Sequence, residues 1–272
     1  LGNDPSRGES SYVDGPQGLA NDGAHWFLAN KEKIFKWDGS YGFPAYAPVG
    51  SQYTEMPSAV SSYDHFGDLD YEEDQDLLYV PLERNDKSLA PRLVVFDANL
   101  NYIDSDVLDK NDTSTNETPW VSIDPVSKEI YTSKFDNVSE LWIYEDLDNS
   151  SGLDLDYIRS LSLKETNGTS LVLHGVQGGE FSKSGHLFLF AQDGPEGMGI
   201  YVINIQNGRL LNYKYVQYES GKRQEFEGIT IWDLDNEPNS GGFEGQVHAL
   251  VWQDGGLFRG AKYWIKHYRV HP

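Results

Sequence analysis

The sequence predicts an all-β protein, a five-bladed β-propeller built from four-stranded antiparallel blades. Five imperfect repeats carry this prediction, with starts near residues 16, 66, 119, 176 and 226. Within each repeat, large apolar and polar residues alternate with the period of two that a sheet strand requires. Repeats of this length are typical of propellers and solenoids. No Pro/Ser-rich linker divides the chain of 272 residues, so residues 1–272 are expected to form a single domain.

Each repeat begins with two strands that we expect to form a hairpin. The pattern is a small or polar start, a short alternating strand, a turn rich in Asp, Gly or Pro, and a second apolar strand. The first repeat shows it in Pro16-Gln-Gly-Leu-Ala-Asn-Asp-Gly-Ala-His-Trp-Phe-Leu, and the fourth in Val176-Gln-Gly-Gly-Glu-Phe-Ser-Lys-Ser-Gly-His-Leu-Phe-Leu. Two strands joined by a tight polar turn form a β-hairpin.

A third, alternating strand follows each hairpin, and a fourth, more polar strand follows in three repeats. The third strands are expected at 34–38, 93–97, 141–144, 200–204 and 263–268. The fourth strands are expected at 102–107, 157–163 and 210–218. Four strands in a unit of about 50 residues is the composition of a propeller blade.

The two ends of the sequence predict how the ring closes. The fifth repeat stops at its third strand near Val270, whereas residues 10–13 precede the first hairpin and have no blade of their own. We therefore expect the N-terminal segment to pair with the last blade, which would leave no exposed sheet edge there. A solenoid or a β-sandwich is the alternative, because the third repeat is the weakest.

The charge of the chain restricts the partners that we expect. There are 43 Asp and Glu residues against 21 Lys and Arg, a formal net charge of −22. Such a surface repels nucleic acid and anionic lipid. Calcium, or a neutral or cationic ligand, fits better, although the charge can also serve solubility alone. No apolar stretch approaches the ~20 residues that span a bilayer, so membrane insertion is not expected.

Sequons indicate the compartment more strongly than the lack of cysteine does. Without cysteine, disulfides and thiolate chemistry are excluded. Five Asn-X-Ser/Thr triplets fall in polar segments, at Asn111, Asn116, Asn137, Asn149 and Asn167. They predict a glycosylated protein that is secreted into the extracellular space.

The starts of the repeats predict where a site would lie. In a propeller the first strand of each blade lines the central channel, so residues far apart in sequence converge on one face. The polar and aromatic residues at these starts are Gln17, His65, Asp68, Trp120, Gln177 and Glu227. We expect a ligand site at this face. The alternative is that these groups bond only to one another and to water.

Three of these residues suggest metal or acid–base chemistry. Asp68 and Glu227 are candidate ligands for Ca²⁺, whose hard cation prefers carboxylate oxygens. His65 and Glu227 are candidate catalytic groups, because an imidazole and a carboxyl can exchange protons with a substrate. Asp68 and Asp70 would point to the same side of a strand. The spacing of this acidic run fits no EF-hand loop, and a solvated acidic turn also explains it.

The other three residues suit recognition of a carbohydrate. Trp120 offers an apolar face on which a sugar ring could stack, and the amides of Gln17 and Gln177 could bind hydroxyl groups. A tryptophan next to a proline is also ordinary packing material.

The segments Gln17-Gly-Leu-Ala, Gln177-Gly-Gly-Glu-Phe and Phe226-Glu-Gly-Ile-Thr resemble blade starts of a large propeller group. That group includes gluconolactonase-like, strictosidine-synthase-like and phytase-like proteins. The resemblance implies a Ca²⁺ ion in the channel, mapped most naturally onto Glu227 and Asp68. This chain has room for five blades rather than six and lacks a recognisable set of the Asn and Asp ligands. The hydrolase activity of those relatives is therefore not carried over.

Two functions follow as expectations. The first is an extracellular binding or scaffold protein that uses one propeller face for a carbohydrate or a protein, or that assembles with copies of itself. The alternative is a Ca²⁺-dependent hydrolase or polysaccharide lyase with its site at the central channel. No Arg or Lys stands at the repeat starts to bind a uronic acid, which weighs against a lyase.

Overall fold

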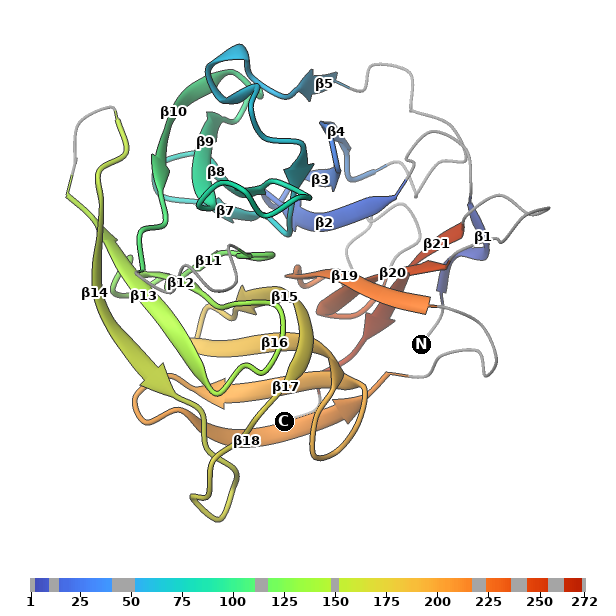
Figure 1. Cartoon of the computed structure of the whole chain (residues 1–272). Helices are drawn as coiled ribbons and strands as arrows, with labels where there is room; N and C mark the ends of the chain where they lie inside the picture. Colours follow the sequence, from blue (N-terminus) through green and yellow to red (C-terminus); the bar gives the residue numbers. More distant parts are fainter. Residues whose placement is uncertain are drawn as a thin grey trace.

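The computed structural model describes residues 3–9, 15–40, 52–110, 117–147, 152–216, 224–235, 244–253 and 262–270. Over these residues the chain forms five antiparallel sheets arranged in a ring (Figure 1). Helix is limited there to a single 3₁₀ turn, η1 (Ser58–Val60). The five sheets and their arrangement confirm the predicted five-bladed β-propeller. Among the described residues, no helix has the length and hydropathy that a membrane span requires.

The blades follow one another in sequence. Blade 1 contains β2 (Pro16–Asn21), β3 (His25–Asn30), β4 (Lys33–Asp38) and β5 (Gln52–Glu55). Blade 2 contains β6 (His65–Phe66), β7 (Asp70–Glu72), β8 (Leu77–Glu83), β9 (Arg92–Asp97) and β10 (Tyr102–Val107). Blade 3 contains β11 (Ser122–Ile123), β12 (Ile130–Thr132), β13 (Glu140–Asp146) and β14 (Leu155–Ser162). Blade 4 contains β15 (His174–Phe181), β16 (His186–Asp193), β17 (Gly199–Asn204) and β18 (Arg209–Tyr215). Blade 5 contains β19 (Gln224–Ile231), β20 (Val247–Gln253), β21 (Lys262–Tyr268) and β1 (Asn3–Glu9).

The predicted third and fourth strands correspond to observed ones. The third strands are β4, β9, β13, β17 and β21, and the fourth strands are β10, β14 and β18. Only β5 was not predicted among the strands of the first four blades. Its four residues are exposed or half-buried and lack the apolar alternation that marks a packed strand.

The ring closes as the sequence predicts, through the N-terminal strand. β1 pairs antiparallel with β21, with Asn3 opposite Lys266 and Glu9 opposite Tyr263. Blade 5 thus has the order β1-β21-β20-β19 and draws its outermost strand from the start of the chain (Figure 1). The pairing strand precedes residues 10–13, which lie outside the described residues. This closure covers the outer edge of the last blade.

The hydrophobic core lies between neighbouring blades, because each sheet buries both of its faces. Blades 4 and 5 show this packing: Phe190 of β16 stacks on Phe226 of β19, with ring centroids 4.1 Å apart and an interplanar angle of 11°. Both rings are fully buried. Burying an aromatic side chain of this size contributes about 1.5–3 kcal/mol. Blade-to-blade contacts of this kind hold the innermost strands close to the axis.

Three innermost strands carry a β-bulge at the same position of the repeat. The pairing register shifts between Pro16 and Gly18 in β2, between Val176 and Gly178 in β15, and between Phe226 and Gly228 in β19. The extra residues are Gln17, Gln177 and Glu227. A bulge bends its strand and redirects the side chain of the extra residue. The repeated Gln/Glu-Gly pair in the sequence is therefore the signature of this bulge.

Candidate functional site

The centre of the ring is closed by the side chain of Asp68, which is fully buried. Its Oδ1 accepts a hydrogen bond from the backbone N–H of Leu19 at 2.9 Å. Its Oδ2 accepts from the N–H groups of Gly179 at 3.3 Å and Ile229 at 3.2 Å. Burial raises the pKa of Asp68 well above its usual value, although these three donors oppose that shift. Both oxygens of Asp68 are thus engaged with the backbones of blades 1, 4 and 5.

Glycine is required where the innermost strands meet this carboxyl group. A Cβ on Gly228 would overlap Oδ1 of Asp68 and lie 2.9 Å from the Cα of Gly18. A Cβ on Gly178 would lie 2.9 Å from Oδ2 of Asp68. The strands can approach one another this closely only without side chains. The glycine after each bulge residue is therefore explained by packing at the axis.

Two cavities lie at opposite ends of the axis. One is at the face where the innermost strands begin, and we call it the start-face cavity. The other is at the face where these strands end, and we call it the end-face cavity. Their lining residues do not overlap.

The start-face cavity has a volume of about 190 Å³ and brings together three of the predicted residues, Gln17, His65 and Gln177. The Nε2 atom of His65 contacts Oε1 of Gln17, and its Nδ1 lies 3.0 Å from Oδ1 of Asn85. Gln177 donates from Nε2 to the carbonyl of Phe226 at 2.7 Å. Burial lowers the pKa of His65. The predicted convergence of these side chains on one face is therefore present.

Glu83 also lines the start-face cavity, and sequence reasoning missed it. Its Oε1 accepts a hydrogen bond from the backbone N–H of Thr118. Burial raises the pKa of Glu83 to about 7. Glu83 lies at the end of β8, the strand that pairs with both β6 and β7. The predicted site residues all stand at repeat starts, so a residue on this strand was not among them. Glu83 and His65 thus place two groups with shifted pKa values in one small cavity.

Asp68, Trp120 and Glu227 lie in the interior and line neither cavity. Trp120 is fully buried, and its Nε1 donates to Oγ of Ser133 at 2.9 Å. Its ring packs so closely on Gly179 that a Cβ there would overlap it. In this structure Trp120 therefore packs the core and presents no face to a sugar.

Glu227, the bulge residue of β19, is 2% exposed. Burial raises its pKa well above the usual value, with a smaller contribution from the charge of Glu225. Across the described ranges, no three His, Asp or Glu side chains converge so that they could hold a metal ion. Calcium binding by Asp68 and Glu227 stays a prediction from the sequence.

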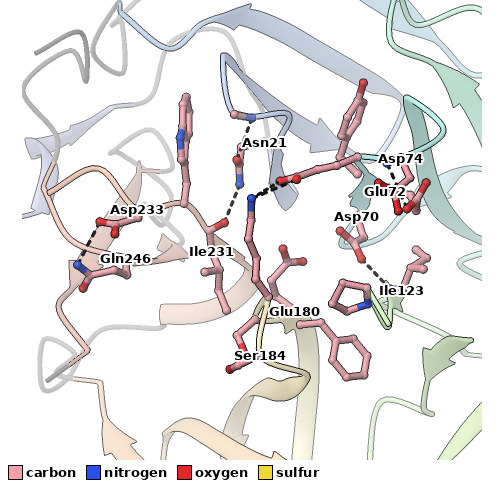
Figure 2. A pocket seen from close by; sticks show the side chains of 18 of the residues that line it. Asn21, Asp70, Glu72, Asp74, Ile123, Glu180, Ser184, Ile231, Asp233 and Gln246 are labelled. Atoms are coloured by element: carbon pink, nitrogen blue, oxygen red, sulfur yellow. Dashed lines mark hydrogen bonds and ion pairs between the residues drawn. The ribbon is translucent and has the colours of Figure 1, made fainter. Parts of the chain in front are cut away.

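The end-face cavity is the larger of the two, with a volume of about 780 Å³ (Figure 2). The ends of β2, β7, β11, β15 and β19 and the turns that follow them form its floor and walls. Every blade contributes to it, so the cavity is centred on the propeller axis.

A pair of carboxyl groups, Asp70 of β7 and Glu180 of β15, lies on the floor of the end-face cavity (Figure 2). Both are buried, with exposed fractions of 7% and 8%. Oδ2 of Asp70 accepts hydrogen bonds from Oγ of Ser122 at 3.0 Å and from the N–H of Ile123 at 2.7 Å. The carboxyl group of Glu180 lies close enough to Asp70 for the charge of one to act on the other.

The pKa values of this pair are raised. Burial raises the pKa of Asp70 to about 6. Burial, together with the charges of Asp70 and Asp68, raises the pKa of Glu180 well above its usual value. Two adjacent carboxyl groups in a buried site cannot both ionise readily, so they share one proton and titrate as a unit.

Charged groups on the turns form the walls of the end-face cavity. Lys128 pairs with Glu72 at 2.6 Å and also with Asp74. Lys183 pairs with Glu73 at 3.1 Å. These ion pairs link the turns of blades 2, 3 and 4 above the carboxyl pair.

The opposite side of the cavity is formed by the segment after β19. Oδ1 of Asp233 accepts a hydrogen bond from Nε2 of Gln246 at 3.2 Å. The ring of Trp232 lies at the wall, tilted against the buried Trp26 with centroids 4.7 Å apart. The cavity thus combines carboxylates, an amide and an aromatic ring.

The sequence repeats contained a signal for the carboxyl pair on the floor of the end-face cavity. Glu180 stands two residues after Gly178, just as Asp70 stands two residues after Asp68, and the period of two sends both toward the axis. The site was predicted at the starts of the strands, whereas Asp70 and Glu180 lie on the same faces near the strand ends.

Two of the five predicted glycosylation sites lie among the residues that the structure describes. Asn137 and Asn167 are exposed, and Oδ1 of Asn167 accepts a hydrogen bond from Oγ1 of Thr169 at 2.7 Å. Asn111, Asn116 and Asn149 lie outside the described residues. Glycosylation and secretion stay predictions.

No protein-family model and no curated protein matches the chain. The structure itself shows the fold, a five-bladed β-propeller.

Proposed function

We propose that this protein is an extracellular binding protein that takes its ligand into the end-face cavity. The observation that carries the proposal is this cavity of about 780 Å³ on the axis, with a buried carboxyl pair on its floor. Its volume falls within the roughly 300–1,000 Å³ that is typical of ligand sites. The start-face cavity, at about 190 Å³, is smaller than that range.

The lining supports a small hydrophilic ligand. Side-chain carboxylates provide hydrogen-bonding groups, and Trp232 provides an aromatic surface. The two ligand classes expected from the sequence, a carbohydrate or a polar segment of an extracellular protein, both carry groups that such a lining can bind. The sequons support an extracellular setting for either ligand.

A blocking variant tests this proposal. The wild-type protein is screened on a glycan array and on a panel of extracellular proteins. Ser184 lines the end-face cavity and is exposed, so Ser184→Trp should fill the opening without disturbing the core. Ser88→Trp makes the same change at an exposed position on the turn after β8, beside the start-face cavity.

We expect binding that Ser184→Trp abolishes and Ser88→Trp preserves. Binding that survives Ser184→Trp would move the site elsewhere on the protein. A complete lack of binding in both screens would remove the proposal.

A second candidate is a calcium-dependent hydrolase or polysaccharide lyase with its site at the central channel. The Asp70–Glu180 pair favours it to the extent that two carboxyl groups with raised pKa values can act as acid and base. The calcium part is tested by melting curves. Millimolar Ca²⁺ should raise the melting temperature, and Glu227→Gln should abolish the rise; no effect of Ca²⁺ or chelator would remove a channel metal.

A further inference from the structure

The lining of the end-face cavity is strongly acidic. It contains six carboxyl groups, Asp70, Glu72, Glu73, Asp74, Glu180 and Asp233, and only two cationic groups, Lys128 and Lys183. Both lysines are already paired with carboxylates of the wall. The two lysines therefore do not neutralise the carboxyl pair on the floor.

One oxygen of this floor has no hydrogen-bond partner. Oε2 of Glu180 is buried and has no hydrogen-bond partner among the residues that the structure describes. Glu180 is more than nine-tenths buried and extends into the cavity (Figure 2). Leaving a buried polar atom without a partner is unfavourable for the folded protein. Such an atom at the floor of a cavity marks a place where a ligand can supply the missing donor.

The hydrogen-bond partners of Asp70 are also uncharged. They are the hydroxyl of Ser122 and the N–H of Ile123. A neutral donor from a ligand would satisfy Oε2 of Glu180 but would not help the second carboxyl group to ionise. A cationic donor would satisfy the oxygen and would also stabilise the pair with both carboxyl groups ionised. Hydrogen bonds from a cation to a carboxylate are roughly twice as strong as neutral ones.

The cavity also suits an organic cation better than a metal ion. No three metal-binding side chains converge here within the described ranges. An ammonium group needs fewer ligands, because it carries three N–H donors, and a guanidinium group carries five. Trp232 and Phe181 line the same cavity, and aromatic rings attract cations. The overall negative charge of the chain attracts cations toward this opening.

We propose that the ligand of the end-face cavity carries an ammonium or guanidinium group, which binds between the carboxyl groups of Asp70 and Glu180. This inference rests on the proposed function, since it names the chemical class of the ligand for that same cavity.

Proton release is a direct consequence of this arrangement. The free pair holds one shared proton, and the bound cation stabilises the doubly ionised pair, so the proton passes to the solvent as the ligand binds. Up to one proton is released for each ligand, and the affinity rises with pH as the free pair ionises. The other charged groups that face the pair are Asp68 beneath it and the wall groups Glu72, Glu73, Asp74, Lys128, Lys183 and Asp233.

Isothermal titration calorimetry tests the inference with defined probes. n-Pentylamine supplies the ammonium group, n-butylguanidine the guanidinium group, and 1-pentanol is the neutral analogue of the amine. Titrations at pH 6.5 in two buffers of different ionisation enthalpy measure the protons released. We expect at least one cation to bind about tenfold or more tightly than 1-pentanol, with proton release.

Glu180→Gln keeps the shape of the side chain and should weaken binding of the cation by about tenfold or more. Asp70→Asn should act in the same direction. Glu32→Gln is the matched control, because it makes the same chemical change at an exposed turn residue between β3 and β4. It should leave the affinity within about twofold, since nonspecific attraction by surface charge changes little. Melting curves of each variant verify that it is folded.

The inference is overturned if neither cation binds better than 1-pentanol, if Glu180→Gln and Glu32→Gln have equal effects, or if no proton is released. Its failure is distinguishable from failure of the proposed function. If a neutral ligand from the screens is lost in Ser184→Trp while both cations fail to bind, the cavity is the site and the cationic ligand is wrong. If neither a ligand from the screens nor either cation depends on the cavity for binding, both the proposed function and this inference are wrong.

Discussion

Asp68 and Leu19 are joined across 49 positions of sequence by a hydrogen bond of 2.9 Å from the backbone N–H of Leu19 to Oδ1 of the aspartate. The same side chain reaches the amides of Gly179 and Ile229 through Oδ2. One carboxyl group from blade 2 thus fastens blades 1, 4 and 5 at the axis. Asp68 is fully buried and lines neither of the two cavities, which share no lining residue. The two faces of the propeller can therefore be altered independently.

Asp68→Ala should destabilise the fold strongly. It leaves three buried N–H groups without an acceptor, and each such group costs about 1–3 kcal/mol. We expect the free energy of unfolding, measured by urea denaturation at pH 7, to fall by about 3 kcal/mol or more. Asp156→Ala at an exposed position of β14 is the control and should change it by less than about 0.5 kcal/mol. Equal effects of the two substitutions would show that the hydrogen bonds at the axis contribute little.

Gly228→Ala should also destabilise the protein, by a different route. The added Cβ would overlap Oδ1 of Asp68 and lie 2.9 Å from both the Cα of Gly18 and the N of Leu19. The Cα of Gly18 and the N of Leu19 are backbone atoms that cannot move without opening the ring. We therefore expect the free energy of unfolding, measured by thermal and urea denaturation, to fall by about 3 kcal/mol or more. Gly23→Ala has open space around its Cβ and only a positive φ of 79°, so it should cost about 1–2 kcal/mol. The comparison fails if Gly23→Ala is the more damaging change.

The strands, the blade order and the closure were accessible from the sequence because they depend on local alternation and on the period of the repeats. The pairing of β1 with β21 followed from counting strands at the two ends of the chain. The Gln/Glu-Gly pairs were recognised as markers of blade starts. Their cause, a bulge followed by a glycine packed against Asp68, depends on contacts between blades that no single repeat reveals.

The site was predicted less completely for the same reason. Gln17, His65 and Gln177 do meet on one face. Whether a residue at a repeat start reaches a cavity depends on how the neighbouring blades pack around it. Trp120 and Glu227 are interior although they also stand at repeat starts, and Glu227 has the same bulge position as Gln17 and Gln177. Glu180 reaches a cavity because it lies near the other end of its strand.

The carboxyl pair should make stability depend on pH with a definite sign. The pKa of Asp70 is raised from 3.8 to about 6, because the folded protein favours its protonated form. The contribution of this form to the free energy of unfolding is fully present at low pH and is lost as the pH rises through 6. Asp70→Asn removes this loss and keeps an oxygen acceptor for Ser122 and Ile123. Relative to wild type, the variant should therefore gain about 2–3 kcal/mol between pH 4 and pH 7.5, at about 1.4 kcal/mol for each unit of pKa shift.

Urea unfolding of both proteins at the two pH values measures this gain. Asp156→Asn, an exposed change of the same kind, should follow the wild type at both. A constant difference between Asp70→Asn and wild type would mean that the pair ionises normally in the folded protein.

A buried histidine pair should act in the opposite direction. Nδ1 of His248 lies 2.7 Å from Nδ1 of His267, and Nε2 of His248 lies 2.8 Å from the carbonyl of Trp232. Because that carbonyl needs a donor, Nε2 of His248 carries its proton, and its Nδ1 accepts from Nδ1–H of His267. Protonating either ring further would destroy this arrangement. Burial lowers the pKa values of His248 and His267 to about 4 and about 3.

Both imidazoles are therefore neutral in the folded protein, and they bind protons below pH 6.5 only when it unfolds. Their contribution to stability is present above pH 6.5 and is lost as the pH falls toward 4, by about 1.4 kcal/mol per pH unit for each ring. His267→Gln removes one titrating ring and retains an amide donor for His248. The slope of unfolding free energy against pH, measured between pH 5 and 6, should therefore fall by about 1.4 kcal/mol per pH unit relative to wild type. An unchanged slope would show that His267 is already protonated in the folded state or that its ring does not titrate separately on unfolding.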